Sequence, residues 1–192
     1  YDPNDLGYLD APNEVVNALS LEYKIVEPFG RFLRLFSSLD LVHTQLYAPR
    51  TFTNLMISGN FGALTQGFQF ARLGFAGSPV RGVDFFEPRI DGYSFNLPAW
   101  GEADFIISTD YRKKIALDLR IARSIAFTEG VDWNGFDFRI EPRFRINDKL
   151  SFSYIYSYQG QFGELGFADT LSIGFIPETK SLFGKRNNKS ET

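Results

Sequence analysis

Histidine is the commonest general base in enzymes, and this sequence has one, at position 43. A Ser-His-Asp site would have to use His43. The residue lies in a strand-like run from Asp40 to Thr44, where we expect a structural or interfacial role. Cysteine is absent, and no group of His, Asp and Glu has the spacing of metal ligands. The sequence therefore predicts no catalytic residue, no metal and no cofactor.

Acidic residues gather at two places that could do chemistry. Residues 2–7 contain Asp, Asn, Asp and Gly and partly resemble a calcium loop, but the distal Glu ligand is absent. Asp84, Glu87 and Asp91 share a long loop and could form the carboxylate pair of a glycosidase. Because any surface loop can hold three acids, we expect neither group to be a site.

A basic run, Arg112-Lys113-Lys114, occupies a short turn. It is interpreted as a solvated turn, with contact to anionic lipid headgroups as the alternative. The formal net charge of the chain is −3, which gives no support to a nucleic-acid partner.

The elements that carry these residues have a period of two. From Gly135 to Asn147 apolar and charged residues alternate, so the segment predicts a strand with one apolar and one ionic face. The apolar face continues on the next segment, Leu150–Gln161, which a tight turn at residues 147–149 joins to the first. Pro142 has no N–H for the ladder and indicates an edge or a bulge.

Two sets of residues follow from this alternation. The residues predicted to face a lumen are Asp118, Arg120, Asp137, Arg139, Glu141, Arg143 and Arg145. The residues predicted to face lipid are Phe136, Phe138, Ile140, Phe144, Ile146, Phe152, Tyr154 and Tyr156.

Similar alternation upstream gives roughly eight strands, with a ninth near Leu171–Ile176. Many of them run about 10 residues, the length of a tilted membrane strand. Short connections lie near 27–30, 64–67, 110–114 and 147–149. Longer ones lie near 48–51, 77–98, 128–134 and 160–169, and this inequality is typical of outer-membrane barrels.

An aromatic face opposite a charged face fits either a soluble β-sandwich or a barrel with lipid outside. An Arg turned to lipid at the bilayer midplane costs about 2–4 kcal/mol, so the charged face must point inward if the chain is in a membrane. Tyr23, Tyr47, Tyr154, Tyr156, Tyr158, Trp100 and Trp133 are candidates for interfacial aromatic girdles. The predicted fold is all-β: an antiparallel up-and-down transmembrane β-barrel, or a partial barrel, of eight to nine long strands.

Several short motifs resemble a known family. They lie at residues 2–9, 85–89, 108–113, 140–150 and 182–186. In this order they resemble the C-terminal outer-membrane barrel domain, of unknown function, of Bacteroidota-type proteins that carry an N-terminal domain like the family 9 carbohydrate-binding modules. The resemblance implies the outer membrane of a Gram-negative bacterium and assigns no catalytic residues.

The resemblance also implies that residues 1–192 are one barrel domain and an internal fragment of a larger barrel. Residues 1–13 would be a lead-in segment and residues 178–192 a polar tail or strand connection. The expected partners are membrane lipid and the remaining strands of the barrel or a partner protein.

Three functions remain open from the sequence. The first is a non-enzymatic barrel segment with a charged lumen that serves transport, passage or surface anchoring. The second is a small closed structural or adhesion barrel of about eight strands. The third is a barrel-type membrane hydrolase, which would depend on His43.

Overall fold

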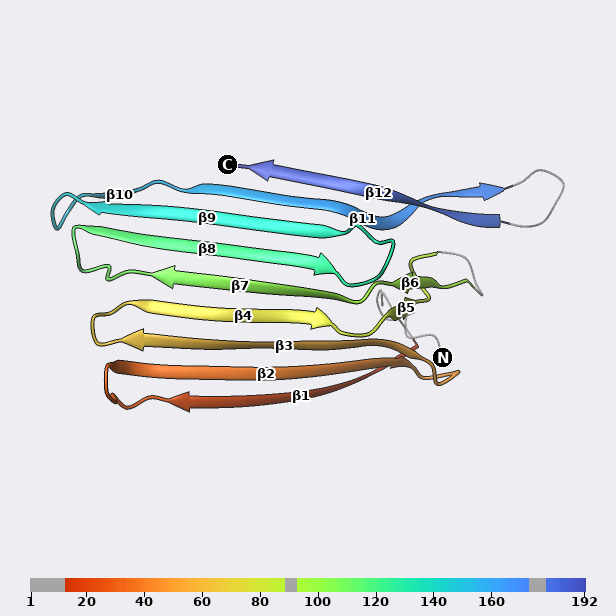
Figure 1. The fold of residues 1–192 in the computed structure, drawn as a ribbon, viewed down its shortest axis with the longest axis horizontal. Coiled ribbons are helices and arrows are strands. Elements are labelled where there is room, and N and C mark those ends of the chain that lie inside the picture. The colour runs from red at the N-terminus through yellow and green to blue at the C-terminus, as the bar shows by residue number, and fades with distance from the viewer. Residues whose placement is uncertain (1–12, 89–92, 173–178) are drawn as a thin grey trace, which may run out of the picture.

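A computed structural model describes residues 13–88, 93–172 and 179–192 of the chain. The described residues are dominated by strands (Figure 1). Among them, no helix has the length and apolar character needed to cross a membrane.

Nine long strands and three short ones make up the described fold. The long strands are β1 (Glu14–Ile25), β2 (Phe32–Leu46), β3 (Phe52–Thr65), β4 (Phe70–Ser78), β7 (Trp100–Ser108), β8 (Ile115–Ala126), β9 (Asn134–Arg145), β11 (Tyr156–Ser172) and β12 (Thr179–Glu191). The short strands are β5 (Gly82–Asp84), β6 (Phe95–Leu97) and β10 (Ser151–Ser153).

The main sheet is an antiparallel meander in which each long strand pairs with the next along the chain. Its order is β1-β2-β3-β4-β7-β8-β9-β11-β12, and β10 pairs with β9 beside β11. The short β5–β6 hairpin is inserted between β4 and β7 (Figure 1). The prediction of an all-β, up-and-down antiparallel fold is therefore confirmed.

The sheet is not closed into a barrel. Within the described ranges β1 pairs only with β2 and β12 only with β11, so both edges are open. The β9–β11 ladder ends at Phe162↔Asn134, and β11 then continues with β12 alone as a two-stranded ribbon. Such two-stranded ribbons twist more strongly than wider sheets. The closed eight-strand barrel is thus corrected to an open sheet.

The connections differ between the two ends of the sheet (Figure 1). One end, called here the turn end, holds the β1–β2, β3–β4, β7–β8 and β9–β10 turns. The other, the loop end, holds the β2–β3 and β8–β9 connections and the β5–β6 insertion. The predicted loop at residues 160–169 is wrong, because these residues lie inside β11. Its glycines led to the loop prediction, but Gly163 with φ +71° forms part of a β-bulge instead.

The predicted hairpin after Gly135 is confirmed, with an irregularity at Pro142. The turn closes with the Ile146 N–H donating to the Leu150 carbonyl at 3.0 Å. Beyond it the partner strand is broken into β10 and β11, whose ladders stop and restart on either side of Pro142. The Pro142 carbonyl accepts from the Tyr154 N–H at 3.1 Å inside this break. A proline cannot donate to a ladder, which explains the interruption.

The C-terminal residues form a strand where the sequence predicts a polar tail or connection. Thr179–Glu191 is β12, and its pairing with β11 extends from Ser172↔Thr179 to Tyr158↔Glu191. The described side chains of this strand are mostly exposed. An edge strand with exposed side chains needs no alternation of apolar residues, so its sequence lacks the usual pattern. The predicted ninth strand at 171–176 falls mostly on residues outside the described ranges.

Candidate functional site: the polar face of the sheet

The strand register places polar side chains in continuous rows on one face of the sheet. Side chains directly opposite each other on paired strands point to the same side. One such row crosses nine strands: Glu22, Ser38, Asn60, Gly74, Asp104, Ala122, Asp137, Gln159 and Ser190. We call this side the polar face.

Its charged residues include Glu14, Glu22, Lys24, Arg34, Asp40, Arg72, Glu102, Asp104, Asp118, Arg120, Asp137, Arg139, Glu141 and Arg143. Arg145 extends the same side opposite Ser151 of β10. The seven residues that the sequence predicts as one charged set therefore share a face.

The opposite side, called here the apolar face, carries rows of aliphatic and aromatic side chains. A representative row is Tyr23, Ser37, Phe61, Leu73, Phe105, Ile121, Phe138 and Tyr158. Phe136, Ile140, Phe144, Phe152 and Tyr156 lie on this face as well. Ile146 and Tyr154 lie just beyond the paired strands and are 59% and 60% exposed. Charged exceptions on this face include Arg123, opposite Phe136 near the loop end, and Lys189 and Glu191 on the edge strand β12.

On β4, β7 and β8 the polar face is the more covered of the two, whereas on β1 both faces are exposed. Ser78 and Ser124 on the polar face are 2% and 7% exposed, whereas Leu73 and Phe75 on the apolar face are 53% and 47% exposed. A sheet in water normally covers its apolar face and exposes its polar one. On β4, β7 and β8 the arrangement is reversed.

An ion-pair network connects β8 and β9 on the polar face. The Glu141 carboxylate accepts from Arg139 Nη2 at 2.9 Å, and its other oxygen lies 2.9 Å from Arg143 Nη2. Arg143 Nη2 is also 3.1 Å from Asp118 Oδ2. Glu141 and Asp118 are only 11% and 20% exposed in their side chains. Pairing of this kind is what permits carboxylates to be buried.

A second ion pair lies toward the middle of the polar face, between β4 and β7. Arg72 Nη2 donates to Asp104 Oδ2 at 2.5 Å, and the Asp104 side chain is 13% exposed. Gly74, directly opposite Asp104, leaves room for this carboxylate, because a Cβ there would meet Asp104 Oδ1 at 2.2 Å. The sequence gives no sign of the pair, since Arg72 lies in an irregular stretch.

Two strand glycines lie beside large aromatic side chains. A Cβ at Gly62 would meet the Phe36 ring at 2.1 Å, and one at Gly59 would meet the Phe75 ring at 2.8 Å. These contacts lie within the sheet, so the glycines have a packing role.

Tyr111 brings the β7–β8 turn onto the charged network. Its hydroxyl donates to Asp118, and the Arg143 guanidinium lies 4.8 Å from its ring centroid. Burial and the hydrogen bond to Asp118 raise the pKa of Tyr111, so the phenol stays protonated and donating at neutral pH. Sequence reasoning missed this residue because it belongs to a turn and has no place in the strand alternation.

The turn itself is held by Asp110 and Arg112. Arg112 donates to the Asp110 carboxylate through Nε and Nη2, each at 2.9 Å, and through its backbone N–H at 2.9 Å. These side-chain and backbone hydrogen bonds lower the pKa of Asp110 to about 2 from its ordinary 3.8. The Arg112 guanidinium also lies 3.6 Å from the Phe68 ring centroid. Arg112 is thus a structural residue of the turn.

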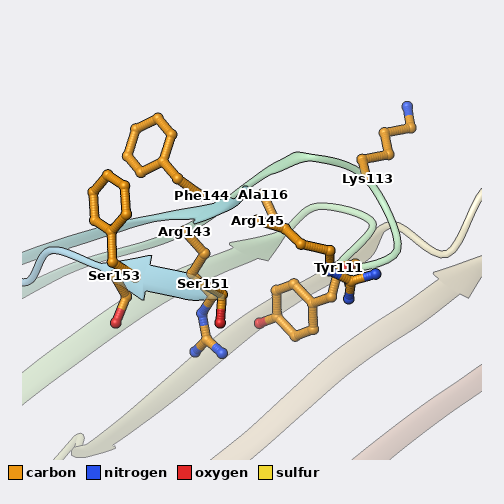
Figure 2. Close-up of a pocket in the computed structure, with 9 residues that line it drawn as sticks. Tyr111, Lys113, Ala116, Arg143, Phe144, Arg145, Ser151 and Ser153 are labelled. Atoms are coloured by element: carbon orange, nitrogen blue, oxygen red, sulfur yellow. Dashed lines mark hydrogen bonds between the residues drawn. The ribbon is translucent and has the colours of Figure 1, made fainter. Parts of the chain in front are cut away.

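A pocket of about 260 Å³ opens at the turn end between the β7–β8 turn and the β9–β10 hairpin (Figure 2). Its lining includes Lys113, Arg143, Arg145, Ser151, Ser153, Phe144 and Phe152. Figure 2 shows Arg143 and Arg145 on the side of Tyr111, while Lys113 and Phe144 point to the opposite side. The pocket therefore lies where the two faces meet.

At the loop end, the β5–β6 hairpin folds over the polar face. A cavity of about 180 Å³ lies between hairpin residues Phe95 and Leu97 and polar-face residues Asn54, Ser78 and Trp100. Trp100 and Trp133 meet edge to face in its wall, with ring centroids 5.6 Å apart. These tryptophans are predicted as members of an aromatic girdle, but Trp100 lies on the polar face, opposite Ser78. The hairpin covers them with apolar residues, which the alternation of the strands does not reveal.

The residues considered for catalysis are separated. His43 lies on the apolar face opposite Leu55 and packs against Phe52, with ring centroids 5.7 Å apart. Asp84 Oδ1 accepts from the backbone N–H groups of Phe86 and Glu87 at 2.8 and 2.9 Å, as in an Asx turn. Asp91 and the stretch at residues 2–7 lie outside the described residues. Within the described ranges, no three His, Asp or Glu side chains gather as metal ligands.

The comparison with protein families gives one match. The model of a domain of unknown function, DUF5916, matches residues 1–192. The chain belongs to this family. Neither the curated proteins nor the solved structures contain a match.

For this DUF5916 chain the match confirms the coarser part of the resemblance, membership of a family of unknown function. Membrane location, barrel closure and a carbohydrate-binding-like partner domain are not part of what it shows.

Proposed function

We propose that this chain is a non-enzymatic segment of outer-membrane β-barrel wall from a Gram-negative bacterium. Its polar face borders a charged lumen and its apolar face contacts lipid. In this position it serves transport, passage or surface anchoring. One observation carries the proposal: large apolar side chains are exposed on one face of the sheet, while charged and polar side chains on the other face are partly buried.

The cost of exposure supports this orientation. Leu21, Tyr23, Phe61 and Leu73 are each more than half exposed on a single face. Burying one such side chain contributes about 1.5–3 kcal/mol, so a surface built of them needs an apolar environment. Lipid supplies that environment along the whole face at once.

The charged residues make the reverse orientation unfavourable. Arg120, Arg139 and Arg143 share the polar face of β8 and β9. Turning this face to lipid would cost about 2–4 kcal/mol for each Arg near the midplane. The ion pairs around Glu141 instead suit a polar interior.

Strand length and connections agree with a membrane span. The long strands have 9–17 residues, against the about 9–11 that a tilted membrane strand requires. The turn end would be periplasmic and the loop end extracellular, as short turns and longer loops are arranged in outer-membrane barrels.

The open edges require further strands in this setting. Unpaired N–H and C=O groups are not tolerated in the hydrocarbon region. We propose that strands of the same protein, or of a partner protein, pair with β1 and β12 and complete the wall.

The competing function is a soluble sheet whose apolar face is covered by another protein layer, as in a β-sandwich. Both functions hide the apolar face, but only the membrane wall places it in contact with lipid. A measurement of what touches each face therefore separates them.

Site-directed spin labelling makes this measurement, because the chain has no native cysteine. Two neighbouring pairs of positions serve: Ile57→Cys with Ser58→Cys in β3, and Tyr158→Cys with Ser157→Cys in β11. In liposomes we expect labels at 57 and 158 to collide with dissolved oxygen. Labels at 58 and 157 should collide with a water-soluble nickel chelate.

Lys149→Cys, in an exposed turn, is the control: its label should collide with the nickel chelate whichever face contacts lipid. Nickel accessibility at 57 and 158, or oxygen alone at 58 and 157, would reverse the orientation and refute the proposal. Failure of every variant to associate with liposomes would favour the soluble sheet.

A further inference from the structure

The turn-end pocket carries positive charge without negative charge in its wall. Lys113, Arg143 and Arg145 contribute three cations, Ser151 and Ser153 contribute hydroxyl groups, and no carboxylate lines it. Arg143 is engaged by Asp118 and Glu141. This leaves the other two cations to account for.

Lys113 and Arg145 have no carboxylate within ion-pair distance in the described part of the chain. Arg145 Nη2 donates one hydrogen bond, to the Tyr111 carbonyl at 3.0 Å. The remaining guanidinium donors of Arg145 and the ammonium of Lys113 are free for an anion. A guanidinium and an ammonium together suit a phosphate, since Arg binds two of its oxygens and Lys adds a point charge.

The same pocket also has an apolar wall. Phe144 and Phe152 stack with ring centroids 4.9 Å apart, and Phe152 is 54% exposed. Both belong to the apolar face, which continues beside the pocket with the exposed Ile115, Ile146 and Leu150. A ligand that fills the pocket thus meets Arg145 on the polar side, and Lys113 together with a broad aromatic and aliphatic surface on the other.

We infer that this pocket binds the phosphate group of an anionic phospholipid, with Lys113 and Arg145 holding the phosphate and Phe144 and Phe152 contacting the acyl chains. Free phosphate shares the headgroup chemistry, but it has no apolar group that could contact the aromatic wall. The inference rests on the proposed function, because it places the pocket at the level of the inner-leaflet headgroups. Basic pockets between transmembrane helices at the headgroup level bind anionic lipid headgroups, and the same chemistry applies here.

Native mass spectrometry of the chain in mixed micelles of phosphatidylglycerol and phosphatidylcholine tests the inference. We expect the wild type to retain one phosphatidylglycerol selectively. The double variant Lys113→Gln/Arg145→Gln should bind phosphatidylglycerol at least roughly tenfold more weakly, because two charged contacts are lost. Arg145→Lys should restore part of the binding because it keeps the charge.

The matched control is Lys149→Gln, which removes one positive charge from the neighbouring turn outside the pocket. An equal loss of binding in this control would show non-specific attraction and overturn the site. Phe152→Ala separates the sources of phosphate: it should weaken lipid binding and leave inorganic phosphate unaffected. Binding of inorganic phosphate with the same dependence on Lys113 and Arg145, together with phosphatidylglycerol binding by Phe152→Ala at the wild-type level, would also overturn a lipid site.

Failure of the site and failure of the proposed function give different results. Equal lipid retention in all variants, together with the expected spin-label pattern, overturns the site alone. A reversed spin-label pattern overturns the proposed function and with it the membrane placement of the pocket.

Discussion

Glu141 is the residue on which the charged network of β8 and β9 depends. It is 8% exposed, and its two oxygens receive Arg139 and Arg143, each at 2.9 Å. Arg120 lies directly opposite Arg139, so like charges adjoin this network. The carboxylate therefore separates arginines that would otherwise repel each other.

Glu141→Gln should destabilise the chain by about 1–3 kcal/mol, because a neutral amide replaces the charged acceptor of two arginines. The free energy of unfolding by urea in detergent micelles, followed by tryptophan fluorescence, measures the effect. Glu22→Gln is the matched control, since its partner Lys24 is more than half exposed and the pair contributes about 0–1 kcal/mol. Equal losses in the two variants would contradict a special role for Glu141.

At this scale the sequence predicts the charged set, because alternation alone assigns residues to a face. It does not predict Tyr111 or the Arg72–Asp104 pair. Tyr111 reaches Asp118 from a turn, and Arg72 of β4 reaches Asp104 on the neighbouring strand β7. Such contacts depend on register and turn geometry, which one strand's pattern does not contain.

The strands show how packing selects small residues inside a sheet. At Gly74 of β4 a Cβ would lie 2.2 Å from the Asp104 carboxylate, which is held in place by Arg72. Because Asp104 is mostly buried, it has little room to move. The glycine therefore couples the backbone of β4 to an ion pair with β7.

Gly74→Ala should destabilise the sheet by about 1–3 kcal/mol through this overlap. Gly67→Ala in the β3–β4 turn is the control, because its nearest neighbour would be Thr65 Oγ1 at an ordinary 3.7 Å. Urea unfolding of both variants compares them. If Gly74→Ala is no less stable than Gly67→Ala, the carboxylate is not fixed at this position.

The sequence predicts the strands that have one apolar face. It does not predict the strands in which neither face is apolar. β1, β2, β3, β8 and β9 show period-two patterns, and the hairpin at Asn147 has a polar turn. β12 has no such pattern, because its described side chains are exposed on an open edge. β11 contains three glycines, and these resemble loop residues although they lie in a strand.

At the scale of the whole molecule, the strands in the described ranges form an open sheet with two unpaired edges. β1 and β12 each have one neighbour, whereas β3 and β8 have two. The sequence cannot predict whether a sheet closes, because closure depends on shear and strand number rather than on local alternation.

The open edges should appear in hydrogen exchange. In micelles, outward amides of β1 and β12 should exchange faster than those of β3 and β8, which pair on both sides. Mass spectrometry of peptides from these four strands measures the difference. Equal protection of β1 and β3 at low protein concentration would mean that the edges are paired and the sheet closed.

The strict alternation of the two faces also gives the sheet a kind of reading frame. Inserting one residue into the middle of β9 would move every side chain beyond it to the other face, so arginines would replace phenylalanines there. Insertions of two residues, or insertions in the connections, keep the frame. The length of an epitope tag inserted in a strand would thus decide its effect. A tag with an odd number of residues would destroy the two-faced surface, and one with an even number would preserve it.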